Sequence, residues 1–542
     1  MRSLYRGRSR LVILMMAMLC VTLLTSCKPK EPDWSEEYVL EPHVIRTYQS
    51  EDWVWAGDPS RAISPDGKWL LVSQYGMSKS ILAVPLKAEE GQDAQGAQSG
   101  NSQVPTPVPM TAAAVEFKTE ADRAQLLPVG WLSDSRCVFL VEGYHDQPPH
   151  KGQTGVSVLS GNVADGAVEE ISFVPIPEGQ LREASIFPSS NWLVLDAMGS
   201  IWTVDLGTGE ARALRKLEVP DYSGLFTPKV SPDGTKCVYA SDGIGSGQGE
   251  SGLCLLDLKT GKETLLARND DELHLYPEWS PDGKMVATYT VDRRSGTTGA
   301  AWSNFEIYPG DDAPMAWGTA IRVLDLSGST VKEISVEDKI LGLFKWAPDS
   351  KSLAFLAARK IPAPDIDGNW EVVMPSPDSV VISSVDPSER ATTIADLGQQ
   401  AANTSTGYLS SYVVGFDPES KGVFYETLNE EAWLIWYRAK GKTGIQSEPD
   451  KPVIVAEGPW HHTPSIPAFK EQGKSFVAFI TGSGPKLSMY LAGPTAIRNV
   501  ANWEGLTSVI VAYDEKTLVV STFTDVYSLS VYEMHSPARR TP

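Results

Sequence analysis

The sequence is poor in cysteine and in positive charge. Its 542 residues include five cysteines, and 47 lysines and arginines stand against 68 aspartates and glutamates, a net charge of −21 at pH 7. Only three cysteines follow the N-terminal segment, too few for a disulfide framework in so long a chain. Cys237 and Cys254 lie on predicted neighbouring strands, where a disulfide or two buried free thiols would both fit, and free thiols are the commoner case. Because phosphate binding needs a basic surface, we expect no nucleic-acid partner.

Long apolar runs are also scarce, and the one at the N-terminus is informative. Arginines precede a 14-residue apolar stretch, Leu11 to Leu24, which is shorter than the roughly 20 residues that span a bilayer. It ends in Leu-Thr-Ser-Cys at 24–27, which resembles a bacterial lipobox. The resemblance implies that residues 1–26 are a lipoprotein signal peptide and that Cys27 carries acyl chains such as palmitate. An ordinary signal with an incidental cysteine is the alternative.

Lipidation would make residues 27–36 a tether and would hold the protein on the extracytoplasmic face of a bacterial cell membrane, in the periplasm or at the cell surface. The mature chain would carry a net charge of about −25, because the signal removes four arginines and no acid. Charge alone would not hold so acidic a chain on anionic lipid, so the membrane partner is expected to be the lipid on Cys27.

A turn motif recurs along the rest of the chain. Ser-Pro-Asp-Gly occurs three times, and looser forms raise the number of units to nine. The units lie at 64–67, 132–135, 187–191, 231–234, 280–283, 347–350, 417–420, 469–474 and 513–517. In this tetrapeptide the proline presets φ, the serine and aspartate hydrogen-bond to the backbone, and the glycine accepts a left-handed conformation. β-rich runs flank each turn, so each unit predicts a β-hairpin.

Further tight turns such as Asp-Leu-Lys-Thr-Gly at 257–261 add two more strands to several units. The combination of Pro-x-Trp-Ser-Pro-Asp-Gly-Lys at 277–284 with such a second turn resembles the TolB-like, WD40-like β-propeller repeat, which also occurs in dipeptidyl peptidases and oligogalacturonate lyases. The resemblance implies an all-β propeller of four-stranded antiparallel blades over residues 37–542. We expect eight blades, with seven to nine possible. The last unit has three strand candidates, and His43 to Gln49 is expected to supply the fourth; residues 88–109 are a low-complexity loop.

Several enzyme signatures are missing. No Gly-x-Ser-x-Gly elbow is present, and Gly-Glu-Ser-Gly at 249–252 has the wrong spacing, so we do not expect a serine hydrolase. Only 36 residues separate Cys27 from Ser64, too few for the α/β domain that precedes the propeller in TolB itself. We therefore do not expect the partners of the Tol system, and we assign no catalytic residues.

Histidines and aromatic residues are the best candidates for a binding site. Loops on the face opposite the Ser-Pro-Asp-Gly turns are expected to surround the channel mouth, where propellers commonly bind ligands. The candidate ligand-binding residues there are His145, His150, His274, Tyr276, Trp460, His461 and His462. Imidazoles from several blades could hold a divalent metal, as the resemblance to the lyases implies. The favoured alternative is that they are ordinary loop histidines.

Tryptophans divide into two groups. Those beside the turns are expected to pack between blades: Trp69, Trp131, Trp279 and Trp346. Those in longer loops are candidates for a binding surface: Trp302, Trp317, Trp370 and Trp460. The insertions 292–319 and 359–378 carry three of this second group and are long for blade loops, which are then often functional.

The sequence therefore predicts a membrane-anchored propeller that acts as a binding or assembly module of the bacterial cell envelope, with an envelope protein or an extracellular ligand as its partner. The alternative is a metal-dependent lyase or hydrolase that acts on a saccharide or a peptide at the channel mouth.

Overall fold

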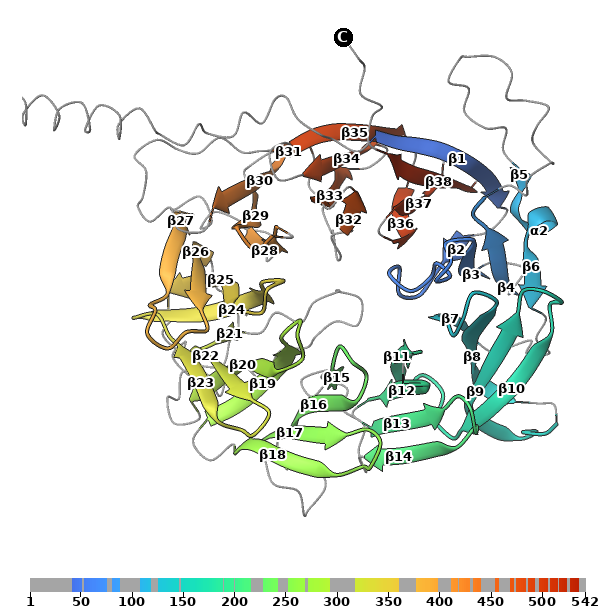
Figure 1. The fold of residues 1–542 in the computed structure, drawn as a ribbon, viewed down its shortest axis with the longest axis horizontal. Helices are drawn as coiled ribbons and strands as arrows, with labels where there is room; N and C mark the ends of the chain where they lie inside the picture. Colours follow the sequence, from blue (N-terminus) through green and yellow to red (C-terminus); the bar gives the residue numbers. More distant parts are fainter. Residues whose placement is uncertain are drawn as a thin grey trace, which may run out of the picture.

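The computed structural model describes the chain between Glu41 and His535 with gaps, and these residues form a ring of β-sheets (Figure 1). The described ranges are 41–50, 53–75, 80–87, 108–117, 125–145, 148–188, 190–198, 200–215, 228–241, 252–268, 272–292, 317–359, 377–397, 411–417, 419–428, 432–439, 454–457, 468–471, 474–483, 486–492, 497–504, 507–514, 516–523 and 527–535. We number the sheets 1 to 9 in chain order.

From the centre of the ring outwards, sheet 1 contains β2 (Trp53–Trp55), β3 (Trp69–Tyr75), β4 (Ser80–Pro85) and β6 (Val115–Phe117); sheet 2 contains β7 (Gln125–Trp131), β8 (Arg136–His145), β9 (Gln153–Asn162) and β10 (Val168–Val174); sheet 3 contains β11 (Leu181–Phe187), β12 (Trp192–Ala197), β13 (Ser200–Asp205) and β14 (Ala211–Arg215). Sheet 4 contains β15 (Lys229–Val230), β16 (Lys236–Ser241), β17 (Gly252–Asp257) and β18 (Glu263–Arg268); sheet 5 contains β19 (Glu272–Trp279), β20 (Met285–Asp292), β22 (Ala320–Asp325) and β23 (Thr330–Ile334). Sheet 6 contains β21 (Trp317–Gly318), β24 (Lys339–Trp346), β25 (Ser352–Arg359), β26 (Pro377–Ser384) and β27 (Thr392–Asp396); sheet 7 contains β28 (Ser411–Phe416), β29 (Gly422–Leu428), β30 (Ala432–Ala439) and β31 (Ile454–Glu457). Sheet 8 contains β32 (Ala468–Glu471), β33 (Lys474–Ser483), β34 (Lys486–Ala492) and β35 (Ile497–Glu504); sheet 9 contains β36 (Thr507–Tyr513), β37 (Thr517–Phe523), β38 (Tyr527–His535), β1 (Glu41–Ser50) and β5 (Val108–Pro109).

The all-β propeller with four-stranded antiparallel sheets is confirmed. Seven of the sheets have four strands and two have five. The expected number of eight is corrected, because nine sheets form in the described part of the chain, the upper end of the expected range. Each of the nine turn units supplies a sheet of its own. The preference for eight rested on the rarity of larger propellers and not on any unit without strands.

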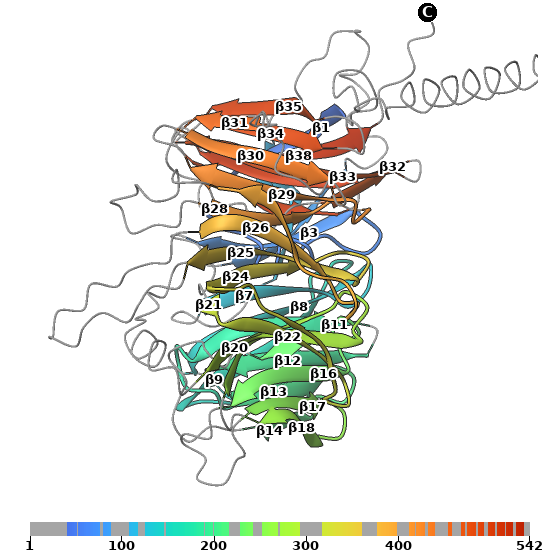
Figure 2. The same cartoon turned by 90° about the vertical axis from the view of Figure 1, so that its left-hand side faces the viewer.

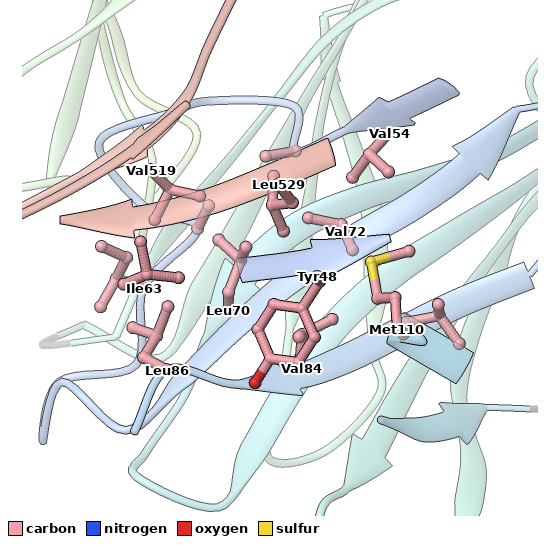
Figure 3. Close-up of a cluster of buried hydrophobic side chains, with 14 residues drawn as sticks. Tyr48, Val54, Ile63, Leu70, Val72, Val84, Leu86, Met110, Val519 and Leu529 are labelled. Atoms are coloured by element: carbon pink, nitrogen blue, oxygen red, sulfur yellow. The ribbon is translucent and has the colours of Figure 1, made fainter. Parts of the chain in front are cut away.

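The two ends of the described chain close the ring. β1 pairs antiparallel with β38, with Thr47 opposite Ser530, which confirms that the N-terminal segment completes the last sheet. The Tyr48 side chain is fully buried, and its hydroxyl donates a hydrogen bond to the carbonyl oxygen of Pro85 in sheet 1. Met110, from the short helix α2 (Met110–Ala113), packs in the same cluster as Tyr48 and Leu529 (Figure 3). One core therefore joins the first sheet, the last sheet and the closing strand.

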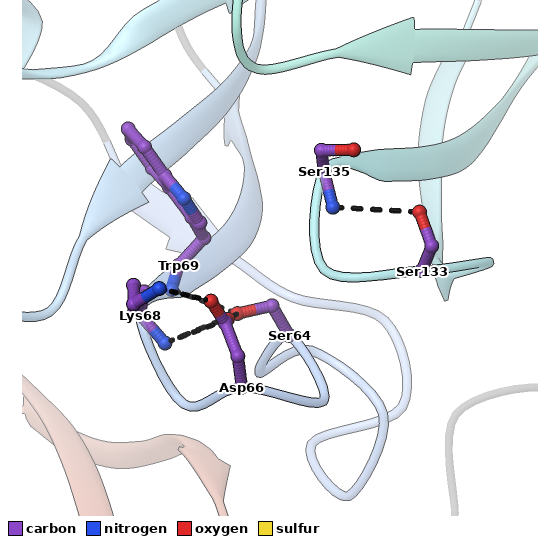
Figure 4. Close-up of polar contacts among 6 residues, drawn as sticks. All are labelled: Ser64, Asp66, Lys68, Trp69, Ser133 and Ser135. Atoms are coloured by element: carbon purple, nitrogen blue, oxygen red, sulfur yellow. Dashed lines mark hydrogen bonds and ion pairs between the residues drawn. The ribbon is translucent and has the colours of Figure 1, made fainter.

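The recurring serine of the turns has a structural role. The Ser64 hydroxyl donates to the Asp66 carboxylate at 2.7 Å and accepts the backbone N–H of Trp69 at 2.9 Å (Figure 4). Ser231 and Ser280 make the same pair of contacts in their own turns. Partial burial alone would raise the pKa of Asp66, but hydrogen bonds from Lys68 and Ser64 outweigh burial and lower it. The Asp66 carboxylate therefore stays charged, and its hydrogen bonds with Ser64 and Lys68 hold the turn together.

Tryptophans beside the turns tie neighbouring sheets together, as expected. The indole N–H of Trp131 donates to the Ala62 carbonyl at 2.8 Å, and that of Trp279 donates to the Lys229 carbonyl at 2.7 Å. Trp346 repeats this contact with the carbonyl of Glu278 at 3.3 Å. Each acceptor lies two residues before a turn in the preceding sheet. The same short motif thus forms both the hairpin and the junction between sheets.

Cysteines contribute to the core as free thiols. Cys137, Cys237 and Cys254 are buried and unpaired with one another. Tyr239 lies opposite Cys254 in the strand register, and Cys237 lies opposite Leu256. Burial raises the pKa of the Cys137 thiol to about 12, so this thiol is protonated and unreactive.

None of the helices in the described ranges is long and apolar enough to cross a bilayer.

Candidate binding face

Strand direction gives the ring two faces, seen from the side in Figure 2. Innermost strands run towards the Ser-Pro-Asp-Gly turns and the second strands run away from them, as β7 and β8 do on either side of the turn at 132–135. We call the side with these turns the turn face and the opposite side the loop face. His145 ends β8 and His274 lies near the start of β19, so both lie towards the loop face.

The histidines of sheet 2 form a cluster at the outer part of that sheet. The His150 ring stacks on Phe173 with ring centroids 4.0 Å apart, and His145 meets Phe173 edge-on at 5.2 Å. His150 Nε2 lies 2.6 Å from Glu170 Oε1, and the other oxygen of Glu170 accepts the Ser157 hydroxyl at 3.2 Å. Phe173 and Glu170 belong to β10, the outermost strand. The cluster is therefore set away from the centre of the ring.

Local sequence explains why the cluster forms. A Cβ at Gly155 would lie 2.3 Å from the Phe173 ring, so glycine is needed for the ring to reach the histidines. His145 Nε2 is buried and has no hydrogen-bond partner within the described residues. Next to it, Tyr144 is 54% exposed. The cluster thus offers two imidazoles and an exposed phenol, with Glu170 fixing the orientation of one imidazole.

His274 has a different environment. Its side chain is 1% exposed, and burial, assisted by the positive charge of Arg322, lowers its pKa to about 4. It is therefore neutral at physiological pH and belongs to the interior of sheet 5. Sheets 3 and 4 lie between it and the cluster of sheet 2 (Figure 1). The structure brings His145 and His150 together and leaves His274 apart.

Tyr276 lies at an irregularity in the innermost strand of sheet 5. Its φ is 48°, in the left-handed region, and the register of β19 shifts between Leu275 and Glu278. The Thr288 hydroxyl donates to the Leu275 carbonyl at 2.9 Å, next to this irregularity. The Tyr276 ring is half-buried and packs against the core between sheets 5 and 6. Its backbone conformation, rather than an exposed hydroxyl, is its distinguishing feature.

Sheet 6 repeats this irregularity beside it. Leu343 has a φ of 51°, and the register of β24 shifts between Gly342 and Lys345. The Phe344 N–H donates to the buried hydroxyl of Tyr289 at 2.8 Å. Left-handed non-glycine residues cost about 1–2 kcal/mol each, and bulges are frequent next to functional sites. β19 of sheet 5 and β24 of sheet 6 thus share the same kind of strained bulge.

The first insertion returns to the ring at the same place. β21 pairs antiparallel with β24, with Trp317 opposite Gly342, and it lies on the inner edge of that strand. Thr319 then binds the Thr290 carbonyl through both its N–H and its hydroxyl. A Cβ at Gly318 would lie 2.9 Å from that carbonyl oxygen, so the close approach requires glycine. The end of the insertion is therefore fixed to sheets 5 and 6.

The second insertion leaves and re-enters sheet 6, between Arg359 and Pro377. Next to its return point, the Asp378 carboxylate accepts a hydrogen bond from the Lys339 ammonium at 2.5 Å, and Ser379 accepts another at 2.8 Å. Lys339 begins the innermost long strand of the sheet, so this ion pair joins the loop-face ends of β24 and β26. The stems of both insertions thus meet on one part of the loop face.

Other predicted residues lie outside the described ranges: Cys27, Trp302, Trp370, Trp460, His461 and His462. Within the described ranges, no group of three or more histidine, cysteine, aspartate or glutamate side chains is arranged to hold a metal ion. Sequence reasoning missed Glu170, Phe173 and the β21 contact. For Glu170 and Phe173 the signal is the β-rich run of β10, Val-Glu-Glu-Ile-Ser-Phe-Val, which identifies a strand without naming its neighbours.

The sequence matches no protein-family model and no curated protein. Similar solved structures include TolB from Acinetobacter baumannii, with 16% identity, a TM-score of 0.26 and coverage of 57% of this chain and 65% of that one. Dipeptidyl peptidase 4 from Porphyromonas gingivalis has 10% identity and a TM-score of 0.45, with 78% and 60% covered. Oligogalacturonate lyase from Vibrio parahaemolyticus has 10% identity and a TM-score of 0.33, with 75% and 92% covered.

At these identities and TM-scores, the likenesses carry no conclusion about the activity, ligand or partners of this chain. The chain spans less than two thirds of the TolB and peptidase structures. The class that the fold itself defines is thus an all-β propeller.

Proposed function

We propose that the protein is a lipid-anchored, extracytoplasmic binding or assembly module of the bacterial cell envelope. Lipid on Cys27 holds it at the membrane. Its partner, an envelope protein or an extracellular ligand, docks on the loop face, where the insertions of sheets 5 and 6 leave the ring.

The pairing of β21 with β24 carries this proposal. The inner edge of a propeller strand presents unpaired backbone groups, which are a ready template for another strand. Here the end of a long insertion takes that edge at Leu341 and Gly342. Long loops on a rigid scaffold are the usual place of binding residues in β-sheet folds. Two such loops, whose described stems lie next to one another in sheets 5 and 6, would together offer one binding face.

A paired deletion tests the role of this face. Residues 295–315 would be replaced by a short Gly-Ser linker that keeps β21, and the control variant would lose residues 90–106 of the low-complexity loop. Cross-linking in the envelope should recover at least tenfold less partner with the first variant and an unchanged amount with the control. Thermal unfolding would verify that both fold. A folded first variant with the wild-type partners would contradict the proposal.

A metal-dependent lyase or hydrolase acting on a saccharide or a peptide is the second candidate. The paired imidazoles of His145 and His150 favour it, since neutral imidazole is a good ligand for transition metals. Thermal unfolding of residues 28–542 with chelator, manganese, zinc or calcium would separate the two functions. Stabilisation that is lost in His145→Ala/His150→Ala or in His461→Ala/His462→Ala would favour the enzyme. The binding module predicts no response to any of these ions.

A further inference from the structure

The described chain enters the ring on the turn face. β37 starts at Thr517, next to a turn, and runs to the loop face; β38 then returns, with Glu533 opposite Thr517. Glu41, the first residue of β1, lies opposite His535 at the turn-face end of β38, and Ser50 lies opposite Tyr527 at the other end. The segment before Glu41 therefore joins the ring at its outer rim, on the side of the turns.

The length of this segment limits how the ring can sit on a membrane. Fourteen peptide units link Cys27 to Glu41, and they reach at most about 50 Å when fully extended. As a flexible coil, they span roughly 20 Å. The ten-residue strand β8 shows that the ring is about 30 Å thick. If the bilayer lay against the loop face, the tether would have to pass round the rim of the ring, and this path would take up most of its length.

Charge on the turn face favours the same arrangement. In two of the turns the Lys at the end is more exposed than its acidic neighbour: the exposed fractions are 71% and 19% for Lys68 and Asp66, and 79% and 37% for Lys284 and Asp282. Equivalent exposed lysines lie in sheets 6, 7 and 9, at Lys351, Lys421 and Lys516. Aspartates of the second turns are engaged by backbone N–H groups, as Asp257 is by Thr260 at 2.8 Å. The turn face of this acidic chain thus presents a row of exposed ammonium groups, beside exposed carboxylates such as those of Glu169 and Glu210.

We propose that the turn face is the membrane-facing side of the protein and that its lysines lie next to anionic lipid headgroups. This inference rests on the lipid anchor of the proposed function. The loop face, with the stems of both insertions, then points away from the bilayer. The chain thus separates its attachment side from its recognition side.

Energy transfer to a labelled bilayer tests this orientation. Donors would be placed on the lipidated full-length protein in anionic vesicles through Asp134→Cys on the turn face or Glu178→Cys on the loop face of the same sheet. The native thiols Cys137, Cys237 and Cys254 are buried and would not react. The donor at position 134 is expected to lie about 20–30 Å closer to the lipid acceptor than the donor at 178. Changing the five turn lysines to serine should reduce this difference.

The outcomes separate the two claims. Equal or reversed transfer from a lipidated, vesicle-bound protein would overturn the orientation and leave the anchor intact. Absence of lipid on Cys27 by mass spectrometry, or vesicle binding that persists in Cys27→Ser, would overturn the anchor and the orientation with it.

Discussion

The two faces of the ring are built on different principles. On the turn face, one tetrapeptide repeats its contacts, so Ser64, Ser231 and Ser280 make the same hydrogen bonds. On the loop face, individual sheets carry features of their own: sheet 2 has the His150–Phe173 stack, and sheets 5 and 6 are joined by the β21 segment. Repetition therefore supplies the stable frame, and departures from repetition mark the surface where a specific function can arise.

Two glycines with the same backbone conformation offer the sharpest contrast. Gly234, in a turn, has a φ of 69°, and a Cβ there would lie 2.4 Å from the Phe187 ring; Gly179, on the loop face, has a φ of 74° and open space. Gly234→Ala should lower the free energy of unfolding by about 2–4 kcal/mol, from strain plus a clash. Gly179→Ala should cost about 1 kcal/mol. Urea denaturation measures the loss of stability in each variant, and equal losses would contradict the expected difference between the two faces.

Acid sensitivity should depend on a buried loop-face residue. The pKa of His274 is about 4 in the folded protein, below its ordinary value of 6.5. Between these values the unfolded chain binds a proton that the folded chain does not, so stability should fall as the pH decreases from 6.5 to 4. The loss at pH 4 should be about 2–3 kcal/mol and should be absent in His274→Gln. Identical pH profiles for the two proteins would show that His274 is not the cause.

Removing the hydroxyl of a turn serine should lower the free energy of unfolding more than removing that of an exposed loop serine. Ser280→Ala leaves the partly buried Met285 N–H without its 2.9 Å acceptor and should cost about 1–3 kcal/mol. Ser335 is exposed in the connection between β23 and β24, and Ser335→Ala should change stability by less than about 0.5 kcal/mol. Denaturation midpoints compare the pair directly. A neutral Ser280→Ala would remove the structural reason for the repeat.

The smallest effect is expected in the cluster of sheet 2. His150→Ala removes a stack on Phe173 and a half-exposed contact with Glu170, together worth about 1 kcal/mol. Lys151→Ala, at the exposed neighbouring position, should have no effect. A loss of several kcal/mol in His150→Ala would instead make this cluster part of the core.

The sequence predicted the features that depend on local chemistry. The residues of the turn motif predicted nine hairpins, and the tryptophans beside the turns predicted the contacts between neighbouring sheets. Because the last unit had only three strand candidates, His43 to Gln49 was predicted as the strand that closes the ring. The expected number of sheets was eight rather than nine because propellers with more than eight blades are rare, although the sequence contains nine turn units. The loop face was predicted as a location for histidines, but His145 meets Phe173 and Trp317 meets Gly342 only through tertiary contacts between distant segments. No local pattern encodes such contacts.

Site-specific photo-cross-linking in intact cells shows directly which face of the ring binds the partner. A photoreactive residue would be placed at Glu337, exposed on the loop face before β24, and separately at Asp134 on the turn face. If the partner binds the loop face, position 337 should give a discrete protein adduct and position 134 should give none. A protein adduct formed from the turn face and absent from the loop face would contradict binding of the partner at the loop face.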